Sequence, residues 1–143
     1  MRTIRFLAIA TLAALVPVAA SAAEEHALLS APLTQAPGHQ LSAVTVTYAP
    51  GQSTPPHRHG GDIFAYVLSG HVRTQIEGGS LHVYGPGESW FEPAGSHHIV
   101  SGNASKTEPA TFLAISIATP QAARTTLDAP ADQSSPAAHT QSR

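Results

Sequence analysis

The chain has 143 residues, a length that suits a single domain. With 42% hydrophobic residues, 11% charged residues, 11 glycines and 12 prolines, it favours a turn-rich β protein and excludes coiled coils, long helical bundles and charge-rich disorder. Seven basic against nine acidic residues provide no basic surface for nucleic acid, and the absence of cysteine excludes disulfides and cysteine-ligated zinc.

Residues 1–22 have the pattern of a secretory signal peptide. A short basic start precedes an apolar run over residues 6–20, and Ala20-Ser21-Ala22 supplies the small-x-small pattern that signal peptidase recognises. The alternative is a transmembrane anchor, but this run is short for a span of about 20 residues. We therefore expect cleavage after Ala22 and a periplasmic or secreted mature protein with no further membrane span.

Residues 28–118 show a succession of short strands separated by glycine and proline turns. Apolar and polar residues alternate with period two in several of them, and residues 63–68 form a continuous apolar run of strand length. Gly78-Gly79 predicts a tight hairpin, because glycine adopts positive φ freely. The expected strands cover residues 44–48, 63–68, 72–76, 81–84, 89–91, 98–100 and 111–117, with a loop over residues 101–108. Six or more short strands without a helical period predict an all-β sandwich or small barrel.

The segment 119–143 is rich in Ala, Pro, Ser, Thr and Gln and has almost no large apolar side chain. Such a segment cannot bury enough surface to offset the entropy of ordering, so we expect a disordered C-terminal tail. The remaining domain, residues 28–118, is near the lower size limit for a fold without disulfides. A homodimer would extend its core across an interface, and we therefore expect one.

His57 and His59 lie in the first of two stretches that could carry chemistry. In a strand, residues two apart point the same way and lie about 6.6 Å apart at Cα. Their rings can therefore converge on one ion, at nitrogen–metal distances of about 2.0–2.1 Å. Exposed histidine pairs at this spacing are also common without a metal.

The second stretch runs from Gly87 to His98. A glycine, five residues, then Pro93-x-Gly95 and a histidine predict a turn, a strand and a second turn. This arrangement can bring one imidazole from a distant strand into the same barrel. The alternative is that His97 and His98 are solvated loop histidines.

Taken together, the two stretches resemble the motifs of the cupin family. The first motif is matched by Gly51-x5-His57-x-His59, ending at Gly70, and the second by Gly87-x5-Pro93-x-Gly95-x2-His98. The resemblance covers about residues 44–117 and implies a cupin barrel, that is, a double-stranded β-helix or jelly-roll-like fold of two antiparallel sheets. It also implies a divalent metal held by His57, His59 and His98.

One departure from the cupin pattern concerns the fourth ligand. Cupins commonly supply a glutamate seven residues before the glycine that matches Gly70, and Ile63 occupies that position here. Asp62 lies one residue earlier, where alternation points it away from the histidines, although a kink at Gly60-Gly61 could turn it inward. Three possibilities stay open: a three-histidine site, a site with Asp62 as fourth ligand, and a site too weak to hold metal in the cell.

Other residues of the second stretch have ordinary interpretations. Glu88 and Glu92 flank its turn and are expected to be solvated, and nothing selects Glu92 as a general base. Trp90 is expected in the core, at a dimer contact or at the mouth of a pocket.

The chemistry of three imidazoles leaves two hypotheses of function. Neutral imidazoles suit Fe, Ni, Cu and Zn, and an added carboxylate shifts the preference toward Mn or Fe. The first hypothesis is a metal-dependent, dioxygenase-like enzyme that acts on a small oxygenated or aromatic molecule. The second is a non-catalytic module that binds a small molecule or a metal. Fold class does not decide between them.

Overall fold

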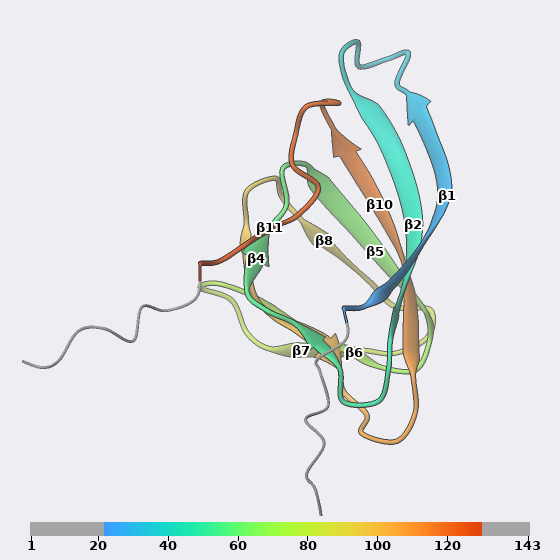
Figure 1. Cartoon of the computed structure of the whole chain (residues 1–143), viewed down its shortest axis with the longest axis vertical. Helices are drawn as coiled ribbons and strands as arrows, with labels where there is room; N and C mark the ends of the chain where they lie inside the picture. Colours follow the sequence, from blue (N-terminus) through green and yellow to red (C-terminus); the bar gives the residue numbers. More distant parts are fainter. Residues whose placement is uncertain (1–21, 130–143) are drawn as a thin grey trace, which may run out of the picture.

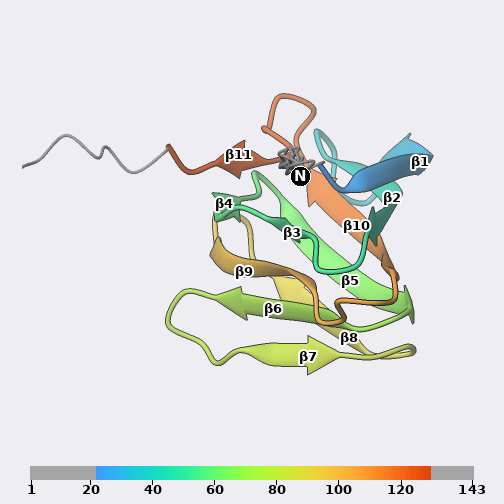
Figure 2. The ribbon, with the colours of Figure 1, turned by 60° about the horizontal axis from the view of Figure 1, so that its bottom comes forward.

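The structure is a computed structural model that describes residues 22–129, and these residues form two antiparallel β-sheets (Figure 1). The strand order is β1-β2-β10-β5-β8 in the first sheet and β11-β4-β9-β6-β7 in the second, where β3 also pairs with β9. Figure 2 shows β4, β9, β6 and β7 in this order, one beside the next. The strands are β1 (Glu24–Pro32), β2 (Gln40–Tyr48), β3 (Ser53–Thr54), β4 (His57–Arg58), β5 (Asp62–Ser69), β6 (Val72–Ile76), β7 (His82–Tyr84), β8 (Ser89–Glu92), β9 (His97–Asn103), β10 (Ala110–Ala118) and β11 (Thr126–Leu127). The predicted all-β fold class is confirmed.

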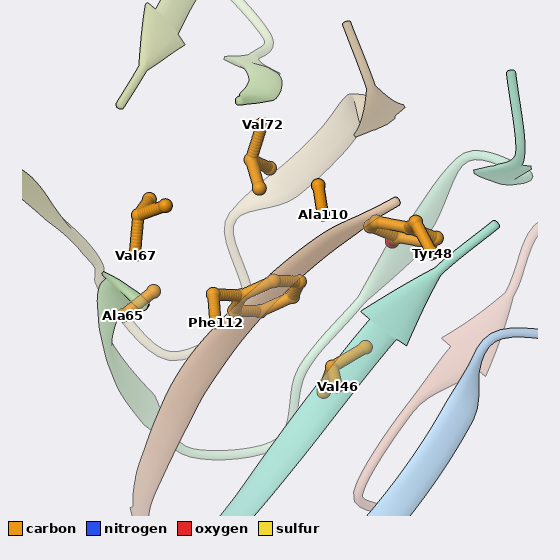
Figure 3. Close-up of a cluster of buried hydrophobic side chains, with 7 residues drawn as sticks. All are labelled: Val46, Tyr48, Ala65, Val67, Val72, Ala110 and Phe112. Carbon is orange, nitrogen blue, oxygen red and sulfur yellow. The ribbon is translucent and has the colours of Figure 1, made fainter. Parts of the chain in front are cut away.

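The core lies between the two sheets, and strand alternation selects its residues. In β5, Ile63, Ala65 and Val67 are buried while the residues between them are exposed, because successive side chains of a strand point to opposite faces. The buried apolar cluster combines side chains from both sheets (Figure 3): Val46, Tyr48, Ala65, Val67, Val72, Ala110 and Phe112.

The turns that the glycines predict are present. β6 and β7 pair as a hairpin around Gly78, whose φ is 81°. Gly70, between β5 and β6, has a φ of 70°, and a Cβ atom placed there would lie 2.3 Å from the carbonyl oxygen of Pro109. Both the backbone conformation and the close approach of the neighbouring chain therefore require glycine at position 70.

Several predicted boundaries were wrong. β1 begins at Glu24, four residues before the expected start of the domain, and β9 extends to Asn103 into the expected loop. The expected disordered tail starts too early, because the structure describes the chain up to residue 129, and within residues 119–129 Thr126–Leu127 form β11, which pairs with β4. These segments are held by main-chain hydrogen bonds. Such bonds do not depend on side-chain type, so no apolar pattern in the sequence indicates them. The predicted signal peptide, apart from its last residue, and the rest of the predicted tail lie outside the described residues.

The outer face of the first sheet is apolar. Phe64, Tyr66 and Leu68 of β5 are exposed, as are Phe91 of β8 and Ile117 of β10. Phe64 and Phe91 face each other across the strand pair. We refer to these five side chains as the outer apolar face. Among residues 22–129, no helix is long and apolar enough to cross a membrane.

Candidate metal centre

Three of the sequence-predicted residues meet inside the barrel. His57 on β4 pairs directly with His98 on β9, and His59 follows β4 immediately. The ring centroid of His57 lies 4.7 Å from that of His59 and 4.9 Å from that of His98. One ring nitrogen of each histidine lies within 4.8 Å of the other two, so the three could hold a metal ion.

Each histidine ring is oriented by a hydrogen bond at the nitrogen that faces away from the cluster. His57 Nδ1 bonds to the carbonyl oxygen of Pro55 at 2.8 Å, and His59 Nδ1 to that of Arg124 at 2.9 Å. His98 Nε2 bonds to Thr74 Oγ1. Outward hydrogen bonds of this kind fix the tautomer and orientation of ligating histidines. They direct His57 Nε2, His59 Nε2 and His98 Nδ1 into the cluster.

The inward nitrogens of His57 and His59 lie 3.1 Å apart. A carbonyl oxygen only accepts, so both Nδ1 atoms must carry their protons, and the Nε2 atom of either ring presents a lone pair when that ring is neutral. Burial lowers the pKa of His57, which keeps that ring neutral. A cation between the two lone pairs would convert their repulsion into attraction. Two nitrogens bound to one ion at about 2.0–2.1 Å lie about 2.9–3.4 Å apart, in agreement with this spacing.

Glu92 is a member of the site that the sequence interpretation missed. Its side chain was expected to be solvated, yet it is buried beside the histidines, with Oε2 3.3 Å from His98 Nδ1 and 3.8 Å from His59 Nε2. Its Oε1 accepts a hydrogen bond from Trp90 Nε1 at 2.6 Å. The signal was the parity of β8: Trp90 and Glu92 share the inner face, while Phe91 points outward.

Two polar atoms of this site have no hydrogen-bond partner. Within residues 22–129, Glu92 Oε2 and His98 Nδ1 are the buried side-chain atoms in this condition, although they lie close to each other. Burial raises the pKa of the Glu92 carboxyl, but the His98 and His59 rings and the hydrogen bond from Trp90 outweigh it, so the pKa lies below its ordinary value. The site therefore contains an ionised carboxylate next to imidazole nitrogens.

Asp62 does not join the cluster. Its Oδ1 accepts a hydrogen bond from the backbone N–H of Ala94 at 2.8 Å, and its side chain lies on the opposite side of β5 from the cavity. The neighbouring Ile63 lines the cavity instead. Regular alternation along β5 thus prevails over the kink that would have turned Asp62 inward.

The cluster closes one side of a cavity of about 360 Å³ between the sheets. Apolar side chains form much of the wall, including Val46, Ala65, Trp90 and Phe112. Tyr48 adds a polar point, since its hydroxyl bonds to Thr54 Oγ1 and Ser101 Oγ, each at 2.8 Å. Apolar walls with a few converging polar groups are typical of small-molecule sites.

The segment 119–129 forms part of the site, where a disordered tail was expected. Arg124 supplies the carbonyl that orients His59, and Leu127 pairs with His57. Asp128 bonds to His97 at 2.8 Å, on the outer side of β9. His97, the other histidine of the His97-His98 pair, thus faces away from the cluster and anchors this segment.

Three solved structures show what the chain is similar to. The DMSP lyase DddQ from Ruegeria pomeroyi DSS-3 has a TM-score of 0.59 at 21% identity over 73% of this chain and 51% of that chain. An uncharacterized protein with a double-stranded β-helix domain from Klebsiella pneumoniae has a TM-score of 0.58 at 20% identity, over 76% of this chain and 85% of that chain. A cupin domain from Bordetella pertussis Tohama I has a TM-score of 0.52 at 22% identity, over 66% of this chain and 92% of that chain. These similarities show the fold, and the chain spans about half the length of the DMSP lyase.

The family comparison covers the same region as the two histidine motifs. A search of the curated proteins finds no match. The family model described as a cupin domain matches residues 44–116, which is half of the chain and includes all three histidines and Glu92. This protein therefore belongs to the cupin family, as its two motifs predicted.

Proposed function

We propose that this cupin holds one divalent transition metal at His57, His59 and His98 and acts with it on a small oxygenated or aromatic molecule in the cavity. The observation that carries the proposal is the set of three inward nitrogens, each on a ring whose other nitrogen is held by a hydrogen bond. Rings oriented in this way do not have to reorganise in order to bind an ion.

The protein's own groups would position the small molecule. Trp90 and Phe112 offer flat apolar surfaces, with ring centroids 5.5 Å apart. Burial raises the pKa of the Tyr48 phenol, so this side chain stays protonated as a hydrogen-bonding group at the cavity wall. The metal, when bound, would supply Lewis-acid or redox chemistry to an oxygen atom of the molecule.

The alternative function is a metal-dependent binding module without turnover. The same cavity and the same histidines serve both functions, so the two differ only in whether a product appears. Oxygen uptake and product analysis over a panel of catechols, β-diketones and flavonols would separate them. Metal-loaded protein that binds compounds of the panel without consuming any would favour the binding module.

Metal analysis of the purified protein tests the shared part of the proposal. We expect about one equivalent of transition metal in the wild type and loss of it in His57→Ala and His98→Ala. His82→Ala is the matched control, because His82 is exposed on β7 and lies outside the cluster. Wild-type protein that holds no metal, even after incubation with Fe(II), Mn(II), Ni(II), Cu(II) and Zn(II), would refute the proposal.

We also propose that the chain is exported, on the basis of the signal-peptide pattern in residues 1–22. Expression in a bacterial host with mass analysis of the periplasmic and secreted fractions tests this. A mature form that begins at Ala23 supports export, whereas uncleaved chain confined to the cytoplasm contradicts it.

A further inference from the structure

We infer that Glu92 is the fourth ligand of this metal site, so that β8 supplies the carboxylate that Ile63 of β5 cannot. The inference rests on the proposed metal site and adds to it the identity of the oxygen donor. It also replaces Asp62, which faces away from the cluster.

The strand register places Glu92 where a carboxylate is needed. Ile63 and Glu92 are direct partners in the antiparallel β5–β8 pair. Directly opposed residues point to the same face of a sheet, with Cβ atoms about 4.5–5.5 Å apart. A carboxylate at position 92 therefore reaches the same space as one at position 63, from the neighbouring strand.

The two oxygens of Glu92 have different surroundings. Oε1 is held by Trp90 Nε1, while Oε2 is buried, makes no hydrogen bond and lies 3.3 Å from His98 Nδ1. A buried carboxylate oxygen without a hydrogen bond is costly, and so is the unsatisfied ring nitrogen beside it. An ion ligated by both atoms would remove both penalties. Trp90 then fixes the carboxylate so that it offers a single oxygen.

The donor set is then three imidazole nitrogens and one carboxylate oxygen. Such a set has a formal charge of −1. Compared with three neutral imidazoles alone, it shifts the metal preference from Cu or Zn toward Mn or Fe. Glu92 would therefore influence which metal the site selects as well as how tightly the metal is held.

The experiment measures Mn(II) and Zn(II) affinity by calorimetric titration of metal-free protein. Glu92→Gln keeps the size of the side chain and the oxygen that accepts from Trp90, and it removes the charge. We expect its Mn(II) affinity to fall about 10–100-fold. We expect its Zn(II) affinity to fall by a smaller factor. Asp62→Asn is the matched control, because it neutralises a carboxylate on the adjacent strand β5 and keeps the oxygen that accepts from Ala94 N–H. We expect its Mn(II) and Zn(II) affinities to equal those of the wild type.

A swap variant keeps the test informative if Glu92→Gln folds poorly. Ile63→Glu combined with Glu92→Ile moves the carboxylate across the strand pair, and we expect Mn(II) binding to persist in the swap but not in Glu92→Ile alone. Wild-type affinity in folded Glu92→Gln, with binding lost in His57→Ala, would overturn the role of Glu92 and leave the metal site intact. Wild-type protein that binds neither metal would overturn both.

Discussion

Ending the chain after Thr119 should weaken metal binding while leaving the barrel folded. This truncation removes Arg124, whose carbonyl oxygen accepts the hydrogen bond from His59 Nδ1 at 2.9 Å. It also removes β11 and its pairing with β4, the strand that carries His57. The core cluster does not use any residue beyond Ala114, so the apolar contacts between the sheets are retained.

The expected loss of overall stability is small. The removed segment contributes main-chain hydrogen bonds such as Gly60 N–H to Ala123 O and Asp128 N–H to Pro56 O, both 3.0 Å long. Each is worth only about 1 kcal/mol net, and removing the segment also removes the entropic cost of ordering it, which opposes the loss of these bonds. We expect the free energy of unfolding of the metal-free protein to change by less than about 2 kcal/mol.

The expected loss of metal affinity is larger. Removing an outer hydrogen-bond partner of a ligating histidine typically weakens metal binding about 10–100-fold. This corresponds to about 1.4–2.7 kcal/mol. Calorimetric titration of the metal-free proteins would measure the affinity, and denaturant unfolding would measure the stability.

A second truncation provides the control. Ending the chain after Ala129 removes residues 130–143 and keeps every contact described for β11, so metal affinity should equal that of the full chain. Equal affinity for all three chains would refute the role of Arg124, because the His59 ring would then be oriented without it. Unfolding of the chain that ends after Thr119 would instead show that this segment is needed for the fold.

Three further predictions concern the barrel. Adding metal at 100 times its Kd should stabilise the wild type by about 2.7 kcal/mol, seen as a rise in Tm that His57→Ala lacks. In denaturant unfolding, Gly70→Ala should destabilise the metal-free protein by more than Gly51→Ala does. Both glycines have a φ of 70°, but only a Cβ at position 70 would lie 2.3 Å from Pro109 O. Equal losses of stability would contradict this reasoning. The outer apolar face is the expected contact between two copies in the predicted homodimer, and Phe91 on it is 58% exposed. Phe91→Asp should therefore convert a dimer into a monomer in sedimentation experiments. A wild-type protein that sediments as a monomer would contradict the dimer.

Much of the fold follows from local patterns. The continuous apolar run over residues 63–68 predicts strand β5 but not which of its faces is buried, and the hairpin at Gly78 follows from the need for positive φ. The three histidines could be brought together only through the spacing of two motifs, because His57 and His98, which are strand partners, lie 41 residues apart in the sequence. No local propensity contains that information.

The missed parts of the site have physical reasons as well. Glu92 lies just before a proline turn, where a charged residue is usually solvated, and only the parity of its strand indicates the inner face. The segment around Arg124 contributes through a backbone carbonyl, and its polar composition carries no sign of that contact. Asp62 was considered because a carboxylate was missing, whereas the pleat of β5 determines its direction.

The carbonyl at position 124 has a consequence for how the site can vary. A main-chain oxygen is present whatever amino acid occupies the position, so exchanging Arg124 for another residue keeps the acceptor for His59. A deletion of one residue between positions 119 and 123 would, in contrast, displace that oxygen along the chain. The orientation of the His59 ring therefore depends on loop length more than on side-chain identity, and insertions and deletions would disturb it more than substitutions.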